Sequence, residues 1–189
     1  MNWYRVRHTI GMYLTLSAQE RAKYIKRHHL FHHMGDKCMV MFRKIPIYPE
    51  LISVGDNVWI ASGVLLVTHD VIHRMLNRCV EGGGFQEHLG CIDIKDNVFI
   101  GSNSTILPNV SIGPNAIIAA GTVVNKSIGG GVYAGVPARY VCSLDDFIEK
   151  RKQIPKIQKE KEKGRISKKT VEAYWQRFKE MENRRGETS

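Results

Sequence analysis

The chain has 189 residues, which is enough for one well-buried domain with modest extensions but short for two full domains. Its formal net charge is +10, as in many nucleic-acid-binding proteins, but the charge is unevenly spread. Residues 1–51 hold nine basic and three acidic side chains, residues 52–142 five and six, and residues 143–189 fourteen and nine. Because the basic flanks carry no nucleic-acid-binding motif, we expect no nucleic-acid partner.

Nothing near the amino terminus predicts export. Arg5, Arg7 and His8 precede only a short mixed apolar run without a small-residue cleavage site. No stretch reaches the roughly 18 apolar residues of a membrane-spanning helix. The four cysteines are scattered without C-x-x-C spacing, so we expect reduced packing residues and no bound metal. These features together predict a cytoplasmic protein without a transmembrane segment.

Residues 1–33 are expected to form an N-terminal helical segment. Ser17 followed by Glu20 is a capping-box pattern before an apolar-periodic stretch, and it predicts a helix over residues 18–33. Residues 34–53 resemble an irregular first turn of the repeat that follows, because Pro46 and Pro49 disturb its spacing.

A six-residue repeat dominates the centre of the chain. Each hexad opens with an aliphatic residue, and the openers are Val54, Ile60, Leu66, Ile94, Ile100, Ile106, Ile112, Ile118 and Val124. A period of six fits neither a helix nor simple strand alternation. Gly, Asp and Asn at the second to fourth positions favour tight corners between short strands. The pattern predicts a mainly β domain over residues 34–142, in which three hexads make one triangular coil of a parallel β-helix.

The repeat is interrupted between Asp70 and Ile94. The excursion, residues 72–91, contains His73, Arg74, Arg78, three consecutive glycines and His88. A long loop leaving a rigid scaffold is typically functional, so we expect it to overhang the active site.

Residues 143–189 are expected to form a C-terminal helical extension. Ser143 precedes a predicted helix from Leu144 to about Lys163, and Ser167 caps a second helix with an apolar face. Such helices either cover the open end of a β-helix or contact a neighbouring subunit.

Residues 52–142 resemble the hexapeptide-repeat acetyltransferases. The similarity rests on the hexads, on VTHD at 67–70, on IGSNSTILPNVSIGPNAIIAAGTVVNKS at 100–127 and on AGVPARYV at 134–141. The maltose/galactoside O-acetyltransferase branch, together with the capsular-polysaccharide and serine acetyltransferases, is the most similar. The resemblance implies a left-handed parallel β-helix and a homotrimer, with acetyl-CoA in a groove between adjacent β-helices.

His69 matches the family's catalytic histidine. A hydroxyl is a weak nucleophile at neutral pH, and an imidazole can take its proton as the thioester is attacked. Asp70 could orient that imidazole, although adjacent residues of a strand face opposite ways.

Other residues match the family's coenzyme-binding positions. The backbone N–H of Ser102 is expected near the acetyl carbonyl, where it could stabilise an oxyanion. Ala120, Asn125 and Lys126 match the pantetheine and nucleotide path, and Arg139 matches an arginine near the CoA phosphates. Relatives often have Thr-Lys where this chain has Asn125-Lys126. The acceptor-binding Asp and Asn of the sugar branch have no clear counterpart in residues 1–50.

The sequence therefore predicts an acetyl-CoA-dependent O-acetyltransferase acting on a sugar or polysaccharide-precursor hydroxyl. Serine, an amino sugar and an antibiotic hydroxyl stay open as acceptors. A zinc site like that of γ-class carbonic anhydrases is an alternative, with His69, His73 and His88 as ligands, but the last two histidines lie in the excursion. A non-catalytic scaffold with basic helices is another.

Overall fold

The computed structural model describes residues 3–162 and 164–186. They separate into two compact units, the coil unit up to Phe147 and the C-terminal unit from Ile148. The helices are α1 (Trp3–Leu14), α2 (Ala18–Arg27), the 3-10 helix η1 (Pro49–Leu51), α3 (Ile72–Cys79), α4 (Leu144–Lys152) and α5 (Lys168–Gly186).

In the described residues, fifteen short strands make up the rest of the regular structure. They are β1 (His33–Met34), β2 (Met39–Val40), β3 (Ile52–Val54), β4 (Trp59–Ile60), β5 (Leu65–Leu66), β6 (Ile92–Ile94), β7 (Val98–Ile100), β8 (Thr105–Ile106), β9 (Val110–Ile112), β10 (Ala116–Ile118), β11 (Val123–Val124), β12 (Gly131–Ala134), β13 (Arg139–Cys142), β14 (Lys161–Glu162) and β15 (Arg165–Ile166).

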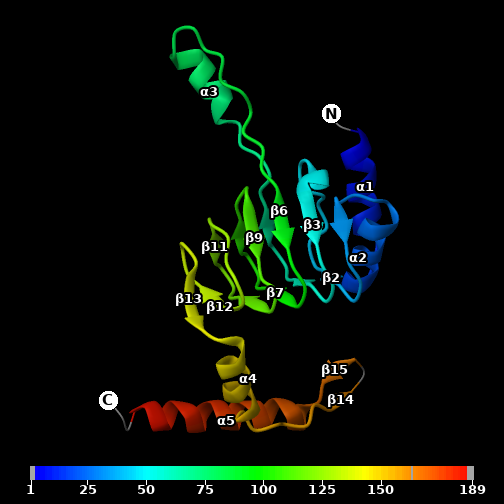
Figure 1. The fold of residues 1–189 in the computed structure, drawn as a ribbon. Helices are drawn as coiled ribbons and strands as arrows, with labels where there is room; N and C mark the ends of the chain where they lie inside the picture. Colours follow the sequence, from blue (N-terminus) through cyan, green and yellow to red (C-terminus); the bar gives the residue numbers. More distant parts are fainter. Residues whose placement is uncertain (1–2, 163, 187–189) are drawn as a thin grey trace. The chain divides into compact units, whose positions relative to one another are not determined.

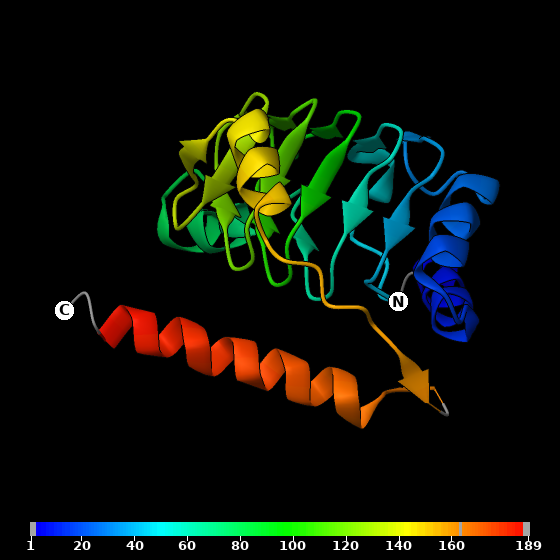
Figure 2. The ribbon, with the colours of Figure 1, turned by 90° about the horizontal axis from the view of Figure 1, so that it is seen from below.

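The strands of the coil unit form three sheets, which Figures 1 and 2 show from two sides. Sheet A has the order β1-β3-β6-β9, sheet B the order β13-β12-β10-β7-β4-β2 and sheet C the order β11-β8-β5. Strands that follow one another in the chain lie in successive sheets, and each pairs in parallel with the strand one coil away. The chain therefore winds as a three-sided parallel β-helix. Among the strand pairs that the structure describes in these three sheets, β12–β13 is the antiparallel one.

The aliphatic hexad openers form the core, as the repeat predicts. All nine are buried, and Ile60, Ile100 and Ile118 have no exposed surface. Strand register stacks these three directly above one another in sheet B. The predicted first coil is present only in part: β1 and β2 pair with sheets A and B, whereas residues 41–51 add no strand to sheet C.

The corner between sheets A and B shows why asparagine recurs in the repeat. Asn57, Asn97 and Asn115 all have a positive φ, between 54° and 58°. Their side chains form a ladder, in which Asn57 donates to Asn97 over 2.9 Å and Asn97 donates to Asn115 over 3.0 Å. Asparagine tolerates this conformation and also satisfies its own amide, so the corner repeats from coil to coil.

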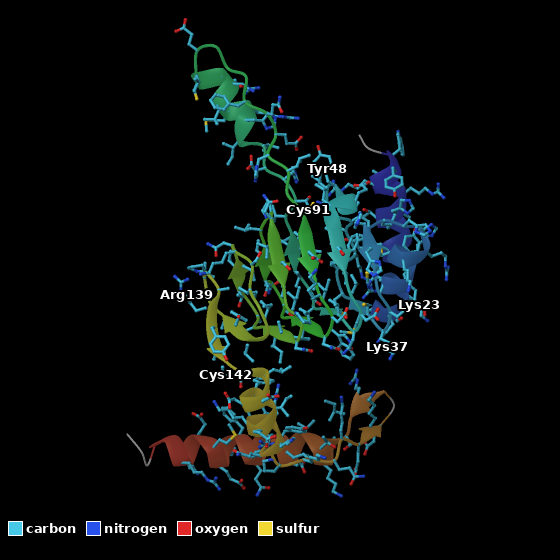
Figure 3. The ribbon with its side chains drawn as sticks, in the orientation of Figure 1. Lys23, Lys37, Tyr48, Cys91, Arg139 and Cys142 are labelled. Atoms are coloured by element: carbon cyan, nitrogen blue, oxygen red, sulfur yellow. The ribbon has the colours of Figure 1, made fainter. Side chains whose placement is uncertain are left out.

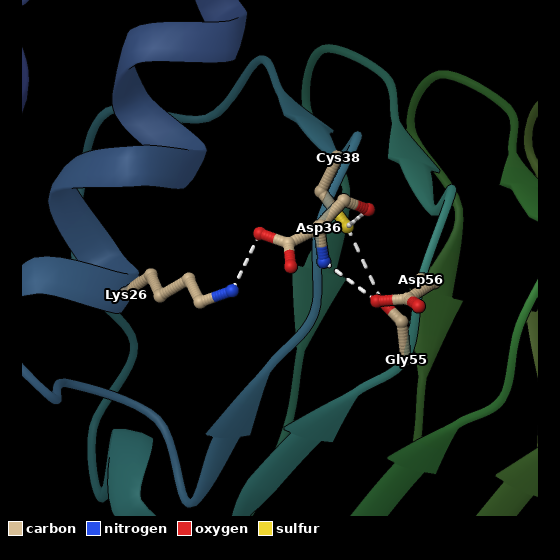
Figure 4. Close-up of polar contacts among 5 residues, drawn as sticks. All are labelled: Lys26, Asp36, Cys38, Gly55 and Asp56. Carbon is tan, nitrogen blue, oxygen red and sulfur yellow. Dashed lines mark hydrogen bonds and ion pairs between the residues drawn. The ribbon is translucent and has the colours of Figure 1, made fainter.

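Helix α2 packs against β1 and β2, the first strands of the stack (Figure 1). Ser17 accepts from the backbone N–H of Glu20, which confirms the predicted cap. Lys26 pairs with Asp36 over 2.5 Å, and the Asp36 N–H donates to Asp56 in the next coil over 2.7 Å (Figure 4). These contacts connect the helix to two successive coils.

The predicted helix over residues 18–33 is too long, because α2 ends at Arg27. The Leu30 N–H donates to the carbonyl of Ile25, and His29 has a φ of 48°. This is a Schellman C-cap with histidine in the position that glycine usually occupies.

The excursion over residues 72–91 contains a helix that the sequence did not predict, α3, which stands away from the coils in Figure 1. Asn77 exchanges two hydrogen bonds with the backbone of Phe85, so the tip is closed on itself. None of the α3 residues is buried.

The predicted helix from Leu144 to about Lys163 is also too long, because α4 ends at Lys152. Pro155 has no N–H to continue the helix and disfavours helical geometry before it. The hydroxyl of Ser167 accepts from the N–H of Thr170, which confirms the predicted cap of α5. None of the described helices combines the length and apolar composition needed to cross a membrane.

Candidate active site

His69 lies where the chain leaves sheet C and the excursion begins. It forms an antiparallel bridge with Leu89 at the returning end of the excursion. On either side, the Gly90 N–H donates to Thr68 over 2.9 Å and the Asp70 N–H donates to His88 over 3.1 Å. The backbone of His69 is therefore held between the rigid coils and the root of the excursion.

The His69 ring meets Tyr48 edge to face, with 5.4 Å between ring centroids and an angle of 87°. Its Nδ1 atom is buried and has no hydrogen-bond partner among the described residues, which leaves Nε2 as the nitrogen that a substrate can reach. The Tyr48 hydroxyl donates to a carboxylate oxygen of Glu87 over 3.0 Å, and this bond raises the pKa of Tyr48. Tyr48 thus connects the ring of His69 to the returning segment of the excursion.

Asp70 makes a local contact. Its Oδ1 accepts from the N–H of Ile72, the first residue of α3, over 3.0 Å. Because Nδ1 of His69 has no partner within the described part of the chain, Asp70 does not bond to that nitrogen in this structure. An orienting role for Asp70 stays a prediction.

An open cavity of about 520 Å³ lies beside His69. Its walls come from residues 41–47, from residues 63–67 and from Arg5 and Tyr13 of α1. Small-molecule sites usually measure about 300–1,000 Å³, so the cavity has room for a sugar-sized acceptor.

Ser102 and Ala120 lie at another corner, between sheets B and C. The carbonyl of Ser102 accepts from Gly121 over 2.8 Å, which stacks the two coils. The coils approach so closely that a Cβ atom on Gly101 would lie 2.4 Å from the Ala120 nitrogen. Within the described residues, the N–H groups of Ser102 and Ala120 make no backbone hydrogen bond, so both are available to an oxyanion or an amide carbonyl.

Asn125 and Lys126 follow β11, at the corner where sheet C meets sheet A. Both are exposed. In sheet C, Leu66 pairs with Ile106, and Ile106 pairs with Val124. Asn125 and Lys126 therefore lie at the same corner of the β-helix as His69, two coils further along the stack. At about 4.8 Å per coil this is roughly 10 Å. Arg139 is the first residue of β13, at the opposite end of the stack from Tyr48 (Figure 3).

The structure therefore divides the predicted site residues between the two ends of the strands of sheet C, which we call its two edges. His69, Asn125 and Lys126 lie along one edge, and Ser102 and Ala120 along the other. The strands of sheet C separate these edges within one chain. A ligand that touches both groups must either cross the outer face of sheet C or lie between two copies of the chain.

No three metal-ligating side chains come together in residues 3–162 and 164–186. His73 lies on α3, and its Nδ1 is buried without a hydrogen-bond partner among the described residues. His88 is exposed on the returning segment of the excursion.

Comparison with known proteins agrees with this architecture. Residues 92–126 match the family model for bacterial transferase hexapeptide repeats (six repeats). Galactoside O-acetyltransferase of Escherichia coli is 37% identical over 116 residues, which cover 60% of this chain and 55% of that protein. The chain thus spans about half the length of the curated relatives it matches.

Two solved structures share the fold. A maltose O-acetyltransferase from Clostridium difficile has a TM-score of 0.55 and 26% identity, covering 75% of this chain and 84% of that one. A galactoside acetyltransferase in complex with coenzyme A has a TM-score of 0.50 and 26% identity, covering 77% and 82%. In its repeat and its fold, the chain is similar to hexapeptide-repeat acetyltransferases.

The sequence did not identify every residue around His69 in this hexapeptide-repeat chain. Tyr48, Arg43 and Lys44 lie in the stretch where the period fails, so no pattern placed them near His69. The sequence signal for this region was Pro46 and Pro49, which interrupt the repeat. They lie where the first coil lacks its third strand, the one that would join sheet C.

Proposed function

We propose that this chain is an acetyl-CoA-dependent O-acetyltransferase with His69 as general base. The main support for this proposal is the position of His69. It lies at a corner of the β-helix, its Nε2 can be reached by a substrate, and a cavity of acceptor size lies beside it. The relatives support the donor, because one is solved with coenzyme A and another is named a maltose O-acetyltransferase.

In the proposed reaction, Nε2 of His69 takes the proton of the acceptor hydroxyl as its oxygen attacks the thioester carbonyl. The negative charge on the carbonyl oxygen is stabilised by the free N–H of Ser102. As the intermediate collapses, the carbon–sulfur bond breaks and the proton on His69 passes to the departing thiolate. The products are an acetyl ester and free CoA.

The two edges of sheet C support a site shared between copies. We infer a homotrimer of left-handed β-helices, in which the His69 edge of one copy faces the Ser102 edge of the next. Acetyl-CoA would lie between them, with Ala120, Asn125 and Lys126 along its path and Arg139 near its phosphates. Asp70 would act through its hydrogen bond from the Ile72 N–H, by fixing the root of the excursion beside His69.

The catalytic module of the proposal is residues 34–142, with residues 1–33 and 143–189 as helical extensions. A sugar or polysaccharide-precursor hydroxyl is the proposed acceptor, and acetyl-CoA as donor favours a cytoplasmic location. Serine, an amino sugar and an antibiotic hydroxyl are the other acceptors to test. The excursion 72–91, which is tied to Tyr48 through Glu87, is expected to influence the choice among them.

The test is thiol release from acetyl-CoA by purified protein with a panel of sugars, serine and hydroxylated antibiotics. We expect acceptor-dependent release that falls by about 10²–10⁴-fold in His69→Ala. His32→Ala is the matched control, because His32 is exposed and outside the cavity. Thiol release that persists in His69→Ala would contradict the role of His69 as general base. Stoichiometric zinc in the purified protein would contradict the proposed mechanism.

A further inference from the structure

We infer that the acceptor carries a negative charge, a carboxylate or a phosphate, close to the hydroxyl that is acetylated. This inference rests on the proposed function and names its substrate class. It comes from the cavity beside His69, whose charged lining residues are Arg5, Arg43 and Lys44, without an aspartate or glutamate.

The positive charge of this cavity is not neutralised by carboxylates at Arg43 and Lys44. Neither residue forms a salt bridge within the described part of the chain. Arg43 Nη1 donates to the main-chain carbonyl of Tyr13 over 2.9 Å, and its guanidinium lies 5.9 Å from the centre of the Tyr13 ring. Carbonyl and ring contacts orient a guanidinium but leave its charge and its other N–H groups for an anion.

Two acids close to His69, Asp70 and Glu87, do not line the cavity. Asp70 accepts from the N–H of Ile72, and Glu87 accepts from the Tyr48 hydroxyl. An anionic acceptor would therefore meet Arg43, Lys44 and the imidazole without a repelling carboxylate among the lining residues.

The rest of the lining suits the body of a sugar. Tyr13, Met41 and Leu65 line the cavity and expose 58%, 37% and 60% of their surface. An apolar wall with an aromatic ring beside a cationic wall fits a ring that has one apolar face and one acidic substituent. An acidic monosaccharide, with its charge as a uronate carboxylate or a sugar phosphate, has this chemistry.

The coenzyme does not account for these cations in the proposed site. In that site Lys126 lies along the path of the coenzyme, two coils from His69. Arg139 lies near the coenzyme phosphates, at the opposite end of the stack from Tyr48 (Figure 3). Arg43 and Lys44 should then affect the KM of the acceptor and not that of acetyl-CoA.

The experiment compares glucose, glucuronic acid and glucose 6-phosphate as acceptors for the wild-type chain. We expect kcat/KM to be at least about tenfold higher for an acidic acceptor than for glucose, and the two acids separate a carboxylate from a phosphate preference. Equal kcat/KM for glucose and both acids, with full dependence on His69, would overturn this inference and leave the proposed function standing. No transfer to these three sugars or to any acceptor of the panel that tests the proposed function would overturn both.

Variants give the second readout. Lys44→Gln, at an exposed position, should raise the KM of the preferred acid about tenfold and leave the KM of acetyl-CoA unchanged. Lys44→Arg keeps the positive charge and should retain the wild-type KM for the acid. Lys23→Gln removes an exposed charge on α2, outside the cavity, and should change neither constant. A Lys44→Gln effect confined to acetyl-CoA would assign the cavity to the coenzyme and contradict the inference. Arg43→Gln tests the second cation once its unfolding temperature matches that of the wild type.

Discussion

The contact between Tyr48 and His69 explains how a histidine at a coil corner keeps a single ring orientation. The buried Nδ1 of His69 has no hydrogen bond within the described residues, so packing rather than a carboxylate positions the ring. The Tyr48 ring supplies that packing edge to face, and its hydroxyl is fixed by Glu87. Tyr48 is therefore a positioning residue that acts through His69.

Removing the Tyr48 ring should lower kcat more than removing its hydroxyl. An aromatic edge-to-face pair contributes about 0.5–1.5 kcal/mol, so Tyr48→Ala is expected to reduce kcat up to about tenfold. Tyr48→Phe keeps the ring and should cost less than about threefold. Steady-state kinetics with acetyl-CoA varied should show an unchanged KM for the coenzyme in both variants. An equal loss in Tyr48→Phe and Tyr48→Ala would show that the hydroxyl, not the ring, matters.

The sequence identifies His69 but not its neighbours, for a physical reason. His69 stands at the end of a regular hexad, where a break in the period is visible. Tyr48 lies in an aperiodic stretch with a φ of 49°, so no local pattern predicts where its side chain points. Its contact with His69 depends on the fold around the missing third strand of the first coil.

At the scale of the strand, the coil is stabilised by stacked aliphatic side chains. Ile60, Ile100 and Ile118 are paired in register and fully buried. Each is the first residue of a hexad, so the six-residue repeat in the sequence corresponds directly to this stack of side chains.

Truncating a stacked isoleucine should destabilise the coil unit strongly. Ile100→Ala is expected to lower the free energy of unfolding by about 2–5 kcal/mol, through lost burial and a cavity. Ile10→Ala removes the same atoms from a side chain that is 55% exposed and should cost much less. Chemical denaturation of both variants measures the difference, and equal costs would contradict the assignment of Ile100 to the core.

A second stability prediction concerns the packing of α1 on α2. His8 is buried, with Nδ1 3.1 Å from the Tyr24 hydroxyl. Burial, with smaller effects from His28 and Arg7, lowers the pKa of His8 below its usual 6.5. Below about pH 6.5 the unfolded chain therefore binds more protons at this site than the folded chain does, and the free energy of unfolding should fall as the pH falls.

Thermal unfolding between pH 7.5 and 5.5 measures this dependence. His8→Gln should reduce the acid-side loss of stability, whereas His32→Gln, at an exposed position, should leave it as in the wild type. An unchanged pH profile in His8→Gln would show that other groups dominate the acid response.

Helix ends were predicted less well than helix starts. The Ser17 and Ser167 caps are side-chain hydrogen bonds encoded by local residue type. The end of α2 depends on His29 in a left-handed conformation, which a search for glycine does not find. The end of α4 was readable from Pro155, but the basic run beyond it has enough helix formers to extend the prediction.

For the whole molecule, the division of predicted site residues between two edges of sheet C is the decisive feature. The sequence places His69 and Ser102 in one stack of coils, but only the strand order shows that they occupy different edges. A site that uses both is completed by a second copy in the proposed arrangement. Light scattering should then give the mass of three chains, and a monomeric active enzyme would contradict it.

The central measurement is activity in mixed oligomers of two inactive variants, His69→Ala and Ala120→Glu, whose added carboxylate should block the coenzyme. If two copies share each site, random 1:1 mixing restores about a quarter of the wild-type activity, because one site in four combines an intact His69 with an intact Ala120 edge. A chain that carries both substitutions, mixed 1:1 with wild type, should also give about a quarter. No activity in the first mixture, with about half in the second, would place the complete site within one chain and contradict the account.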